Sequence, residues 1–466
     1  MAGPPPRHWV TAVLLPTLLL AVVALPVVST VAGAEALAAS RAPLWQKQWR
    51  PAGGDGFGGA HLARAGTGDL YVAGPLYRLA SSQVDWAVAR FTAAGTRKWV
   101  RTLAGPYNGN DALSAVAADA AGNVVAVGQV ATGSLSTQSD WMVAKWNRAG
   151  KLLWKRQTDG SGHGYDLAKD VVAGADGSFY VVGQMDRVGE SDDGVIVKYS
   201  ALGKTLWSRY IDAPEPGSDK LNAVALDAKG NAYVTGHDYD GSRAHDVVLA
   251  RYSPSGHTDW FRRWGDQTAL NHDQGSSIAV RGSVVAIAGV SWTIFPPNVW
   301  VDRGLALKYT TSGVLKWSRI RANDSPSLRA AWDLVGVDGS GRVAVAGPRV
   351  TSAGVPTPLS WVTTVYSSSG TAGVVQQLQG ALDYYNLAAD LDSTAGGGVY
   401  ETGSLGSATK GRDLSVVAMR AGGTLAWTSR PTLSGGSAGG GIVATSTAVY
   451  VAGNAGSSMI LLKYRP

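Results

Sequence analysis

The stretch "VAKWNRAGKLLW", residues 143–154, returns along the chain with the same spacing between its glycine and its last tryptophan. It reads "VARFTAAGTRKW" at 88–99, "IVKYSALGKTLW" at 196–207 and "LALKYTTSGVLKW" at 305–317. In each copy an apolar run ends in a basic and an aromatic residue, a Gly-containing turn follows, and a second strand pattern begins. The copies therefore predict one β-hairpin that the chain uses many times.

Three sequence anchors recur in a fixed order, and each occurs eight times, which indicates a single structural repeat. One of them, which we number third, is the strand that ends in a basic and an aromatic residue, as in Lys145-Trp146, with Val365-Tyr366 and Ala418-Met419 as degenerate copies. The first anchor, Gly-x-x-x-Trp, places its last residue at Trp45, Trp99, Trp154, Trp207, Trp260, Trp317, Val374 and Trp427. The second, an apolar strand ending in Tyr-Val-x-Gly or a variant, has Gly74, Gly128, Gly183, Gly236, Gly289, Gly347, Gly403 and Gly453.

The glycines of the second anchor lie 50 to 58 residues apart, which leaves room for four short strands and their turns but shows no helical periodicity. In the second unit we expect strands over 113–119, 123–129, 140–146 and 151–157. Sheets of four strands repeated at a constant period are typical of a β-propeller. We interpret the Gly-containing turns as chain reversals, and the repeated tryptophan as packing between the outer strands of neighbouring blades.

The two ends of the chain carry complementary parts of a repeat. The chain opens with a lone fourth strand, "APLWQKQW" at 42–49, and closes with a third strand, "SMILLKYRP" at 458–466. We therefore predict an all-β, eight-bladed β-propeller of four-stranded antiparallel blades over residues 43–466. The N-terminal strand would complete the last blade and close the ring.

Composition excludes several classes of function. Lysine and arginine exceed aspartate and glutamate by 41 − 34 = 7, but the basic residues are scattered singly, so we expect no nucleic-acid partner. The chain has no cysteine, which excludes disulfides, thiolate zinc sites and a cysteine nucleophile. Stability must therefore come from packing, for which 17 tryptophans and 17 tyrosines supply large side chains.

Residues 1–38 have the pattern of a secretory signal peptide. One arginine precedes an apolar run over 10–28, and small residues follow at 32–34 and 36–38, where cleavage would occur. The alternative is an uncleaved anchor, because the run is nearly long enough to span a bilayer. We expect a secreted, extracellular protein that acts as a monomer and has no membrane span once the signal is removed.

The unit from 139 to 184 resembles the SBBP beta-propeller repeat of secreted bacterial proteins. The pattern of that family is an Asp-led strand, a Lys-aromatic pair, Gly-x-x-x-Trp and then Asp-x-x-Gly-Asn-x-Tyr-Val-x-Gly. The resemblance covers residues 43–466 and is strongest in units two to four. It implies a propeller in an extracellular setting, with no assigned chemistry. The leading aspartate of the repeat is matched by Asp85, Asp140, Asp193, Asp246 and Asp413, whereas Arg303, Ser360 and Ser458 depart from it.

A looser resemblance links the chain to eight-bladed propellers of the pyrroloquinoline-quinone type. Ala306, Gly313 and Trp317 are in step with the tryptophan-docking motif of those proteins. The aspartate of that motif is an aromatic residue here, as at Tyr309, and the chain has no vicinal cysteines. These departures argue against a bound quinone, and we expect no organic cofactor.

In such a blade, the loops between second and third strands open on the same face as the connections between blades. These loops differ in length and chemistry while the turns on the other face are alike, so we place function on the face of the varied loops. The longest loop, 290–303, carries Trp292, Phe295 and Trp300 around two prolines. It is either an aromatic platform for a sugar or protein ligand, or a loop folded over its own side chains.

Two acidic loops could hold Ca²⁺, which prefers oxygen ligands. One contains Asp186, Glu190 and Asp192, and the other contains Asp238 and Asp240 beside His245. Neither spacing matches a complete calcium loop, so solvated acidic loops are the alternative.

Four aspartates share one position at the start of the innermost strand, where they could rim a central channel. Such carboxylates could bind a ligand or act in acid–base chemistry, but repetition in consecutive blades favours a turn-capping role. The residues are Asp111, Asp166, Asp219 and Asp273, with His163 and His272 nearby.

These patterns favour an extracellular binding or interaction scaffold for a glycan or a protein over an enzyme. The alternative is a propeller hydrolase or lyase acting on polysaccharide. An enzyme needs a non-repeated group of carboxylates or histidines that converge at one place, whereas a binding module needs an exposed patch.

Overall fold

The computed structural model describes residues 39–52, 55–107, 109–133, 138–189, 192–211, 217–239, 241, 245–265, 271–295, 299–321, 331–350, 359–380 and 386–466. For residues 271, 293–295 and 299–300 it describes the backbone alone. The expected signal peptide, Glu190 and Asp240 lie outside these ranges. Within them, no helix is long and apolar enough to cross a membrane.

The described residues form seven sheets, built almost wholly from antiparallel strands that follow one another in the chain. The first half contains β2 (Trp45–Trp49), β3 (Gly56–Phe57), β4 (His61–Arg64), β5 (Leu70–Arg78), β6 (Gln83–Phe91), β7 (Arg97–Leu103), β8 (Ala112–Ala118), β9 (Val124–Ala131), β10 (Ser139–Trp146), β11 (Leu152–Thr158), β12 (Leu167–Ala173), β13 (Phe179–Asp186), β14 (Asp192–Tyr199), β15 (Thr205–Ile211), β16 (Lys220–Leu226), β17 (Ala232–Tyr239), β18 (His245–Tyr252) and β19 (Thr258–Trp264). The second half contains β20 (Asn271–Arg281), β21 (Val284–Phe295), β22 (Val299–Thr310), β23 (Leu315–Ile320), β24 (Leu334–Val337), β25 (Val343–Val350), β26 (Leu359–Tyr366), β27 (Ala372–Leu378), β28 (Leu387–Ser393), β29 (Val399–Ser407), β30 (Gly411–Met419), β31 (Leu425–Ser429), β32 (Ser437–Ala444), β33 (Val449–Ala455) and β34 (Ser458–Tyr464).

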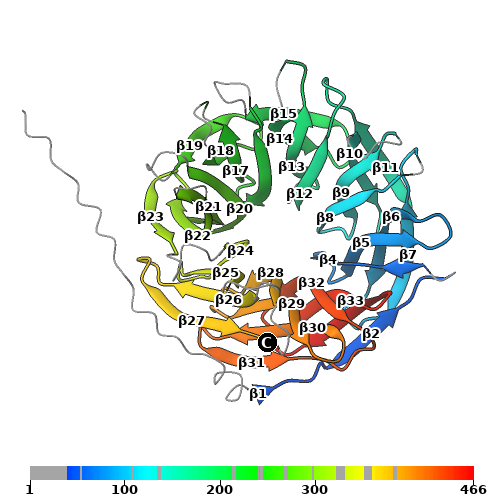
Figure 1. Cartoon of the computed structure of the whole chain (residues 1–466). Coiled ribbons are helices and arrows are strands. Elements are labelled where there is room, and N and C mark those ends of the chain that lie inside the picture. The colour runs from blue at the N-terminus through cyan, green and yellow to red at the C-terminus, as the bar shows by residue number, and fades with distance from the viewer. Residues whose placement is uncertain are drawn as a thin grey trace, which may run out of the picture.

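The sheets stand around a common centre (Figure 1). The first strand of each unit, such as β8, β12 or β28, faces the centre, and the fourth, such as β11 or β27, lies at the rim. Neighbouring first strands contact one another, as β8 contacts β12 and β28 contacts β32. The chain is therefore an all-β protein with the architecture of a β-propeller.

The hairpin turns have the geometry that their glycines predict. In the turn between β10 and β11, the Gly150 N–H donates to Asn147 O at 2.8 Å, and Gly150 has a φ of 84°. The register shifts by one residue at Lys145/Trp146, which is a β-bulge beside the turn. A side chain at this φ would be strained, so glycine is required there.

The glycine of the Tyr-Val-x-Gly anchor has a different cause. A Cβ at Gly183 would overlap the carbonyl oxygen of Leu167 on the innermost strand, and a Cβ at Gly236 would overlap that of Lys220. At both places the innermost strand carries a register shift two residues further on. The anchor is glycine because two backbones come closer there than a side chain allows.

The repeated tryptophan packs against the next sheet and hydrogen-bonds to it, as its sequence position predicts. The Trp154 indole N–H donates to Ala201 O at 3.1 Å, in the hairpin turn of the next unit. The Lys145 ammonium donates to the same carbonyl at 3.1 Å, and a Cβ at Gly203 would lie 2.6 Å from the Trp154 ring. The same indole-to-carbonyl contact recurs at Trp99, Trp207, Trp260 and Trp317.

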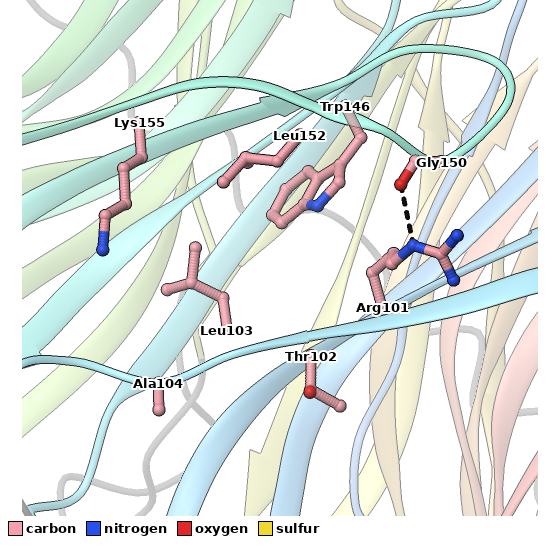
Figure 2. Close-up of a pocket in the computed structure, with 8 residues that line it drawn as sticks. All are labelled: Arg101, Thr102, Leu103, Ala104, Trp146, Gly150, Leu152 and Lys155. Carbon is pink, nitrogen blue, oxygen red and sulfur yellow. Dashed lines mark hydrogen bonds between the residues drawn. The ribbon is translucent and has the colours of Figure 1, made fainter.

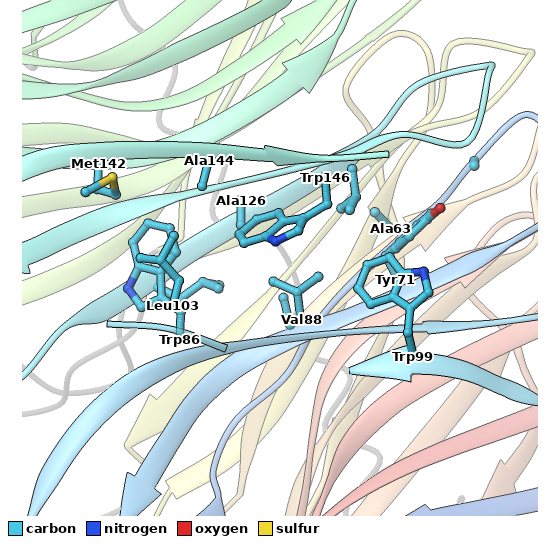
Figure 3. Close-up of a cluster of buried hydrophobic side chains, with 14 of the residues drawn as sticks. Ala63, Tyr71, Trp86, Val88, Trp99, Leu103, Ala126, Met142, Ala144 and Trp146 are labelled. Carbon is cyan, nitrogen blue, oxygen red and sulfur yellow. The ribbon is translucent and has the colours of Figure 1, made fainter. Parts of the chain in front are cut away.

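Buried side chains fill the space between neighbouring sheets. Figure 3 shows one such cluster, in which Trp86, Val88 and Trp99 from the β5–β7 sheet meet Ala126 and Trp146 from the next sheet. This cluster is one of several of the same kind around the molecule, and each contains side chains from two neighbouring units. The core is thus divided among the contacts between units.

The two ends of the chain lie together. β2 pairs antiparallel with β34 from Trp45 opposite Lys463 to Trp49 opposite Met459. The Trp45 ring lies beside Gly95 in the β6–β7 turn, in the way that other tryptophans seat on the next turn. A short strand that the sequence pattern does not predict, β1 (Ala39–Ser40), pairs in parallel with β31.

Candidate functional site

We call the face that carries the β5–β6, β13–β14 and β17–β18 hairpins and the connections between units the loop face. The opposite face carries the short glycine turns, which repeat the same hydrogen bonds from unit to unit. The loop face also holds the start of each innermost strand, where the sequence places its candidate residues.

Asp111 and Asp166 act as backbone clamps at that position. The Asp166 carboxylate accepts the N–H of Gly160 at 2.5 Å and of Asp186 at 2.7 Å. Asp111 accepts the corresponding N–H groups of Gly105 at 2.5 Å and Ala131 at 3.0 Å. Each carboxylate thus joins the connection before it to the end of the second strand, which agrees with the turn-capping interpretation.

The same position is filled elsewhere by residues that can accept the same bonds. Asp219 accepts the Tyr239 N–H at 2.8 Å, and Asp273 is buried at 1% exposure. Asn386 accepts from Gly380 and Gly406 at 2.9 and 2.8 Å through one oxygen. The bonding pattern therefore does not need a negative charge.

One group of carboxylates does converge. The ligand atoms of Asp140, Asp159 and Asp166 all lie within 4.8 Å of one another. Asp159 accepts from the exposed His163 ring at 2.7 Å, and this contact raises the pKa of His163. Burial raises the pKa of Asp166 to about 6, even though its two backbone hydrogen bonds favour the charged form.

Each carboxylate of this group already accepts at least one hydrogen bond from the protein. Both Asp166 oxygens accept backbone N–H groups, and Asp140 accepts from the Gln157 side-chain amide at 2.7 Å. Proximity alone does not make a catalytic pair when the oxygens are satisfied by the scaffold.

The first acidic loop is partly described. Asp186 and Asp192 stand opposite each other at the end of the β13–β14 hairpin. Asp192 accepts from Gln184 at 2.7 Å and lies 3.6 Å from the Lys220 ammonium, while burial raises its pKa. The Ca²⁺ site that the sequence suggests in this loop therefore stays a prediction.

In the second acidic loop, Asp238 is fully buried and forms an ion pair with Arg263. Burial raises the pKa of Asp238, and Arg263 partly offsets that rise. The side chain therefore faces a cation of the protein itself, at the base of the loop.

The segment predicted as a long loop at 290–303 is an extended hairpin. β21 and β22 stay paired from Val284 opposite Thr310 out to Phe295 opposite Val299. Trp292 is half-buried near this end, with its ring centroid 6.4 Å from that of His272. Phe295 and Trp300 lie on the two strands, and their side chains are outside the described part.

Histidines gather beside Trp292. The Nδ1 atoms of His245 and His272 are 2.7 Å apart, and the His237 and His245 ring centroids are 5.0 Å apart. Burial, helped by the neighbouring His245, lowers the pKa of His237 to about 3, so its ring is neutral at ordinary pH. His245 and His272 stand out separately in the sequence, whereas His237 does not.

A groove of about 550 Å³ lies on the loop face between units that are far apart in sequence. Tyr77, which is 50% exposed, stands over Gly58 at its edge. The Asp55 carboxylate accepts from the Arg78 guanidinium at 2.9 Å and from the Leu79 N–H at 3.1 Å, which fixes the hairpin tip. The groove is lined by residues 56–59, 77–79, 82–83, 454 and 456–457 together with Arg412.

A second groove lies at the rim and belongs to the repeated contact between units. Figure 2 shows Leu103, Leu152 and Trp146 around it, and Arg101 donating to Gly150 O at 2.7 Å. The same arginine-to-glycine bond recurs at Arg156, Arg262 and Arg319. A feature that every unit repeats is better explained by assembly of the fold than by a ligand.

Carboxyls that the sequence analysis did not single out lie on the innermost strands. The Asp390 carboxylate accepts the N–H of Leu391 and of Ile442 on the next unit, both at 2.8 Å, and burial raises its pKa to about 7. Asp170 makes the same kind of bridge to Val224 N–H at 2.9 Å. An alignment of the repeats would have identified both as acidic residues at the position where the register of the innermost strand shifts.

Comparisons with known proteins bear on the fold alone. No family model matches the chain, and no curated protein matches it. Among solved structures, Sqt1 from Chaetomium thermophilum is similar with a TM-score of 0.53 and 11% identity, over 90% of this chain and 100% of that one. The WD40 domain of SCAP from fission yeast gives 0.45 and 10%, over 90% and 98% of the two chains. The beta-propeller domain of the Trilobed protease from Pyrococcus furiosus gives 0.39 and 9%, over 77% and 93%.

Proposed function

We propose that this chain is a secreted, monomeric β-propeller of eight blades that serves as an extracellular binding scaffold. Eight units of the SBBP-like repeat and the β2–β34 pairing support the blade count and a ring closed by the N-terminal strand. The apolar N-terminal run supports secretion. Its ligand is a glycan or a protein that docks on the loop face.

The observation that carries this proposal is the groove under Tyr77. In this groove an exposed aromatic ring, a guanidinium and several amide and hydroxyl groups meet. Aromatic and arginine side chains dominate the energetics of binding surfaces. Asp55 holds the hairpin tip in place, so less conformational entropy is lost when a ligand binds.

Binding is favoured over catalysis on polysaccharide by the state of the acidic groups. An enzyme of that kind needs two carboxyls free to exchange protons with a substrate. In the Asp140, Asp159 and Asp166 group, the oxygens of Asp166 are held by the backbone. The groove, in contrast, exposes Tyr77 and leaves space for a ligand.

Ligand-dependent thermal unfolding of residues 39–466 tests the proposal, because a ligand of the folded state raises the midpoint. We expect a shift with at least one member of a glycan panel, measured with and without Ca²⁺. Tyr77→Ala and Arg412→Ala should abolish a shift that arises in the groove, and Trp292→Ala should abolish one that arises at the extended hairpin. Lys151→Ala, on the turn face, is the matched control and should leave the shift unchanged.

The outcomes separate the alternatives. A shift that survives every loop-face variant would contradict the loop face as the binding surface. If no glycan shifts the midpoint, the ligand is not a glycan of the panel. Turnover of a glycan that binds would overturn the choice of a scaffold over an enzyme.

A further inference from the structure

Three histidine rings meet on the loop face where the β16–β19 unit joins the β20–β23 unit. The Nδ1 atoms of His245 and His272 face each other at 2.7 Å, and these two residues form the bridge that links β18 to β20 in one sheet. His237, on β17, packs edge-on against His245 with ring centroids 5.0 Å apart. The three rings thus come from three strands, and the His245 ring lies between the other two, with centroids 5.0 Å from His237 and 4.9 Å from His272.

One nitrogen of the third ring makes no hydrogen bond within the protein. The Nδ1 atom of His237 is buried and has no hydrogen-bond partner. Buried ring nitrogens are normally hydrogen-bonded, and an exception needs an explanation. A ligand that accepts a nitrogen lone pair, such as a metal ion, would provide one.

The position is repeated, but the histidines are not. The bridge between units that His245 and His272 form is made by Val84 with Asn110 and by Ser139 with Tyr165 elsewhere. Neither of those pairs offers two ring nitrogens. Histidines therefore replace ordinary residues at one joint only among these three bridges, which a purely structural role would not require.

We propose that His237, His245 and His272 bind a divalent transition-metal ion of the Zn²⁺ type. Imidazole nitrogen suits Zn²⁺, Ni²⁺ and Cu²⁺, whereas Ca²⁺ prefers oxygen ligands. Two nitrogens on one tetrahedral ion lie about 3.3 Å apart, given bonds of about 2.0–2.1 Å. The Nδ1 atoms of His245 and His272 lie 2.7 Å apart, so a small rotation of the two rings would bring them to this spacing. The ring of His237 must also turn toward them.

Binding of the ion by the His245–His272 pair requires no net gain or loss of protons. In the metal-free pair, one Nδ1 donates its hydrogen to the other. When the ion binds, this hydrogen moves to the Nε2 of the donating ring, so both rings stay neutral and present a lone pair from Nδ1. Three protein nitrogens leave a fourth position for an exogenous ligand.

Cobalt(II) and zinc titrations of the untagged chain 39–466 test the site. We expect one ion per chain by calorimetry with Zn²⁺, and visible absorption bands of nitrogen-coordinated Co²⁺. His272→Phe and His237→Phe, which keep a ring and remove its nitrogens, should each weaken binding by at least about 10-fold. His257→Phe alters an exposed histidine in the β18–β19 turn and is the matched control. Circular dichroism of the metal-free variants checks that each is folded, and the two ligand variants serve as independent tests.

Retention of full affinity in both His272→Phe and His237→Phe would overturn the proposal. So would the absence of any one-to-one binding of Zn²⁺ or Co²⁺. Loss of binding in His163→Phe, with His272→Phe unaffected, would assign the ion to the Asp140, Asp159 and Asp166 group instead. The result is independent of whether a glycan binds in the groove, so failure here leaves the scaffold proposal standing.

Discussion

Trp154 is a single side chain on which two sheets depend. It is 9% exposed, its ring lies against Gly203 of the next hairpin turn, and its indole N–H reaches Ala201 O. We expect Trp154→Ala to lower the free energy of unfolding by about 3–5 kcal/mol, the usual cost of removing a buried tryptophan. Trp154→Phe should lower the free energy of unfolding by less, because phenylalanine keeps most of the packing and only the hydrogen bond is lost. Urea unfolding followed by circular dichroism measures both, and a wild-type midpoint for the alanine variant would contradict this role.

Glu401 makes stability depend on pH. It is fully buried, accepts from the Trp361 indole at 2.6 Å and the Thr363 hydroxyl at 2.7 Å, and burial raises its pKa to about 8. Because the folded state holds this proton and the unfolded state releases it near the ordinary glutamate pKa of 4.5, stability falls as pH rises from about 4.5 to 8. The slope from one such group is at most about 1.4 kcal/mol per pH unit.

We expect Glu401→Gln to remove this slope and to unfold at a higher temperature than the wild type at pH 8. Midpoints measured from pH 5 to 9 test this expectation. Asp390, whose pKa burial raises to about 7, contributes a slope of the same sign, so Asp390→Asn in the same background separates the two. A midpoint of the wild type that rises between pH 5 and 8 while that of Glu401→Gln stays flat would refute the assignment.

At the scale of elements, the Asp166 clamp explains why an acid recurs at the start of the innermost strand. We expect Asp166→Ala to destabilise by about 2–4 kcal/mol, because two buried N–H groups lose their acceptor. Asp166→Asn should cost far less, since Asn386 makes the corresponding two bonds with one oxygen. Thermal and urea midpoints report the difference. Equal losses in the two variants would show that the clamp at Asp166 needs the negative charge.

Strands and their order were predictable because a repeat shows the same pattern many times. Strands β8 to β11 lie within two residues of the predicted ranges, and the tryptophan contact follows from its spacing to the glycine turn. The extended β21–β22 hairpin was not predictable, because it departs from the repeat by adding paired residues at the adjoining ends of both strands. β1 was missed because a two-residue parallel pairing has no periodicity of its own.

The candidate site was less predictable than the fold. Asp166 and His163 were recognised from their position in the repeat, but Asp159 enters only because the chain folds back beside Asp140. His237 was overlooked for the same reason, since its contact with His245 depends on how β17 and β18 pair. Side chains that differ from their counterparts in other repeats are the signal that an alignment of the units would have provided.

The pairing of the two chain ends contributes to the stability of the molecule. β34 is buried along most of its length, and β2 covers its outer edge through five residue pairs. Removing residues 39–50 would leave an apolar edge strand unpaired, which favours aggregation. We expect a chain that begins at residue 51 to unfold at a lower temperature and to aggregate on heating. A circular permutant that carries residues 43–50 after residue 466 should regain the lost stability, because the same strand then reaches β34 from the other terminus. If the truncated chain keeps the wild-type midpoint, β2 does not hold the molecule together, and the proposed closure of the ring by the N-terminal strand is wrong.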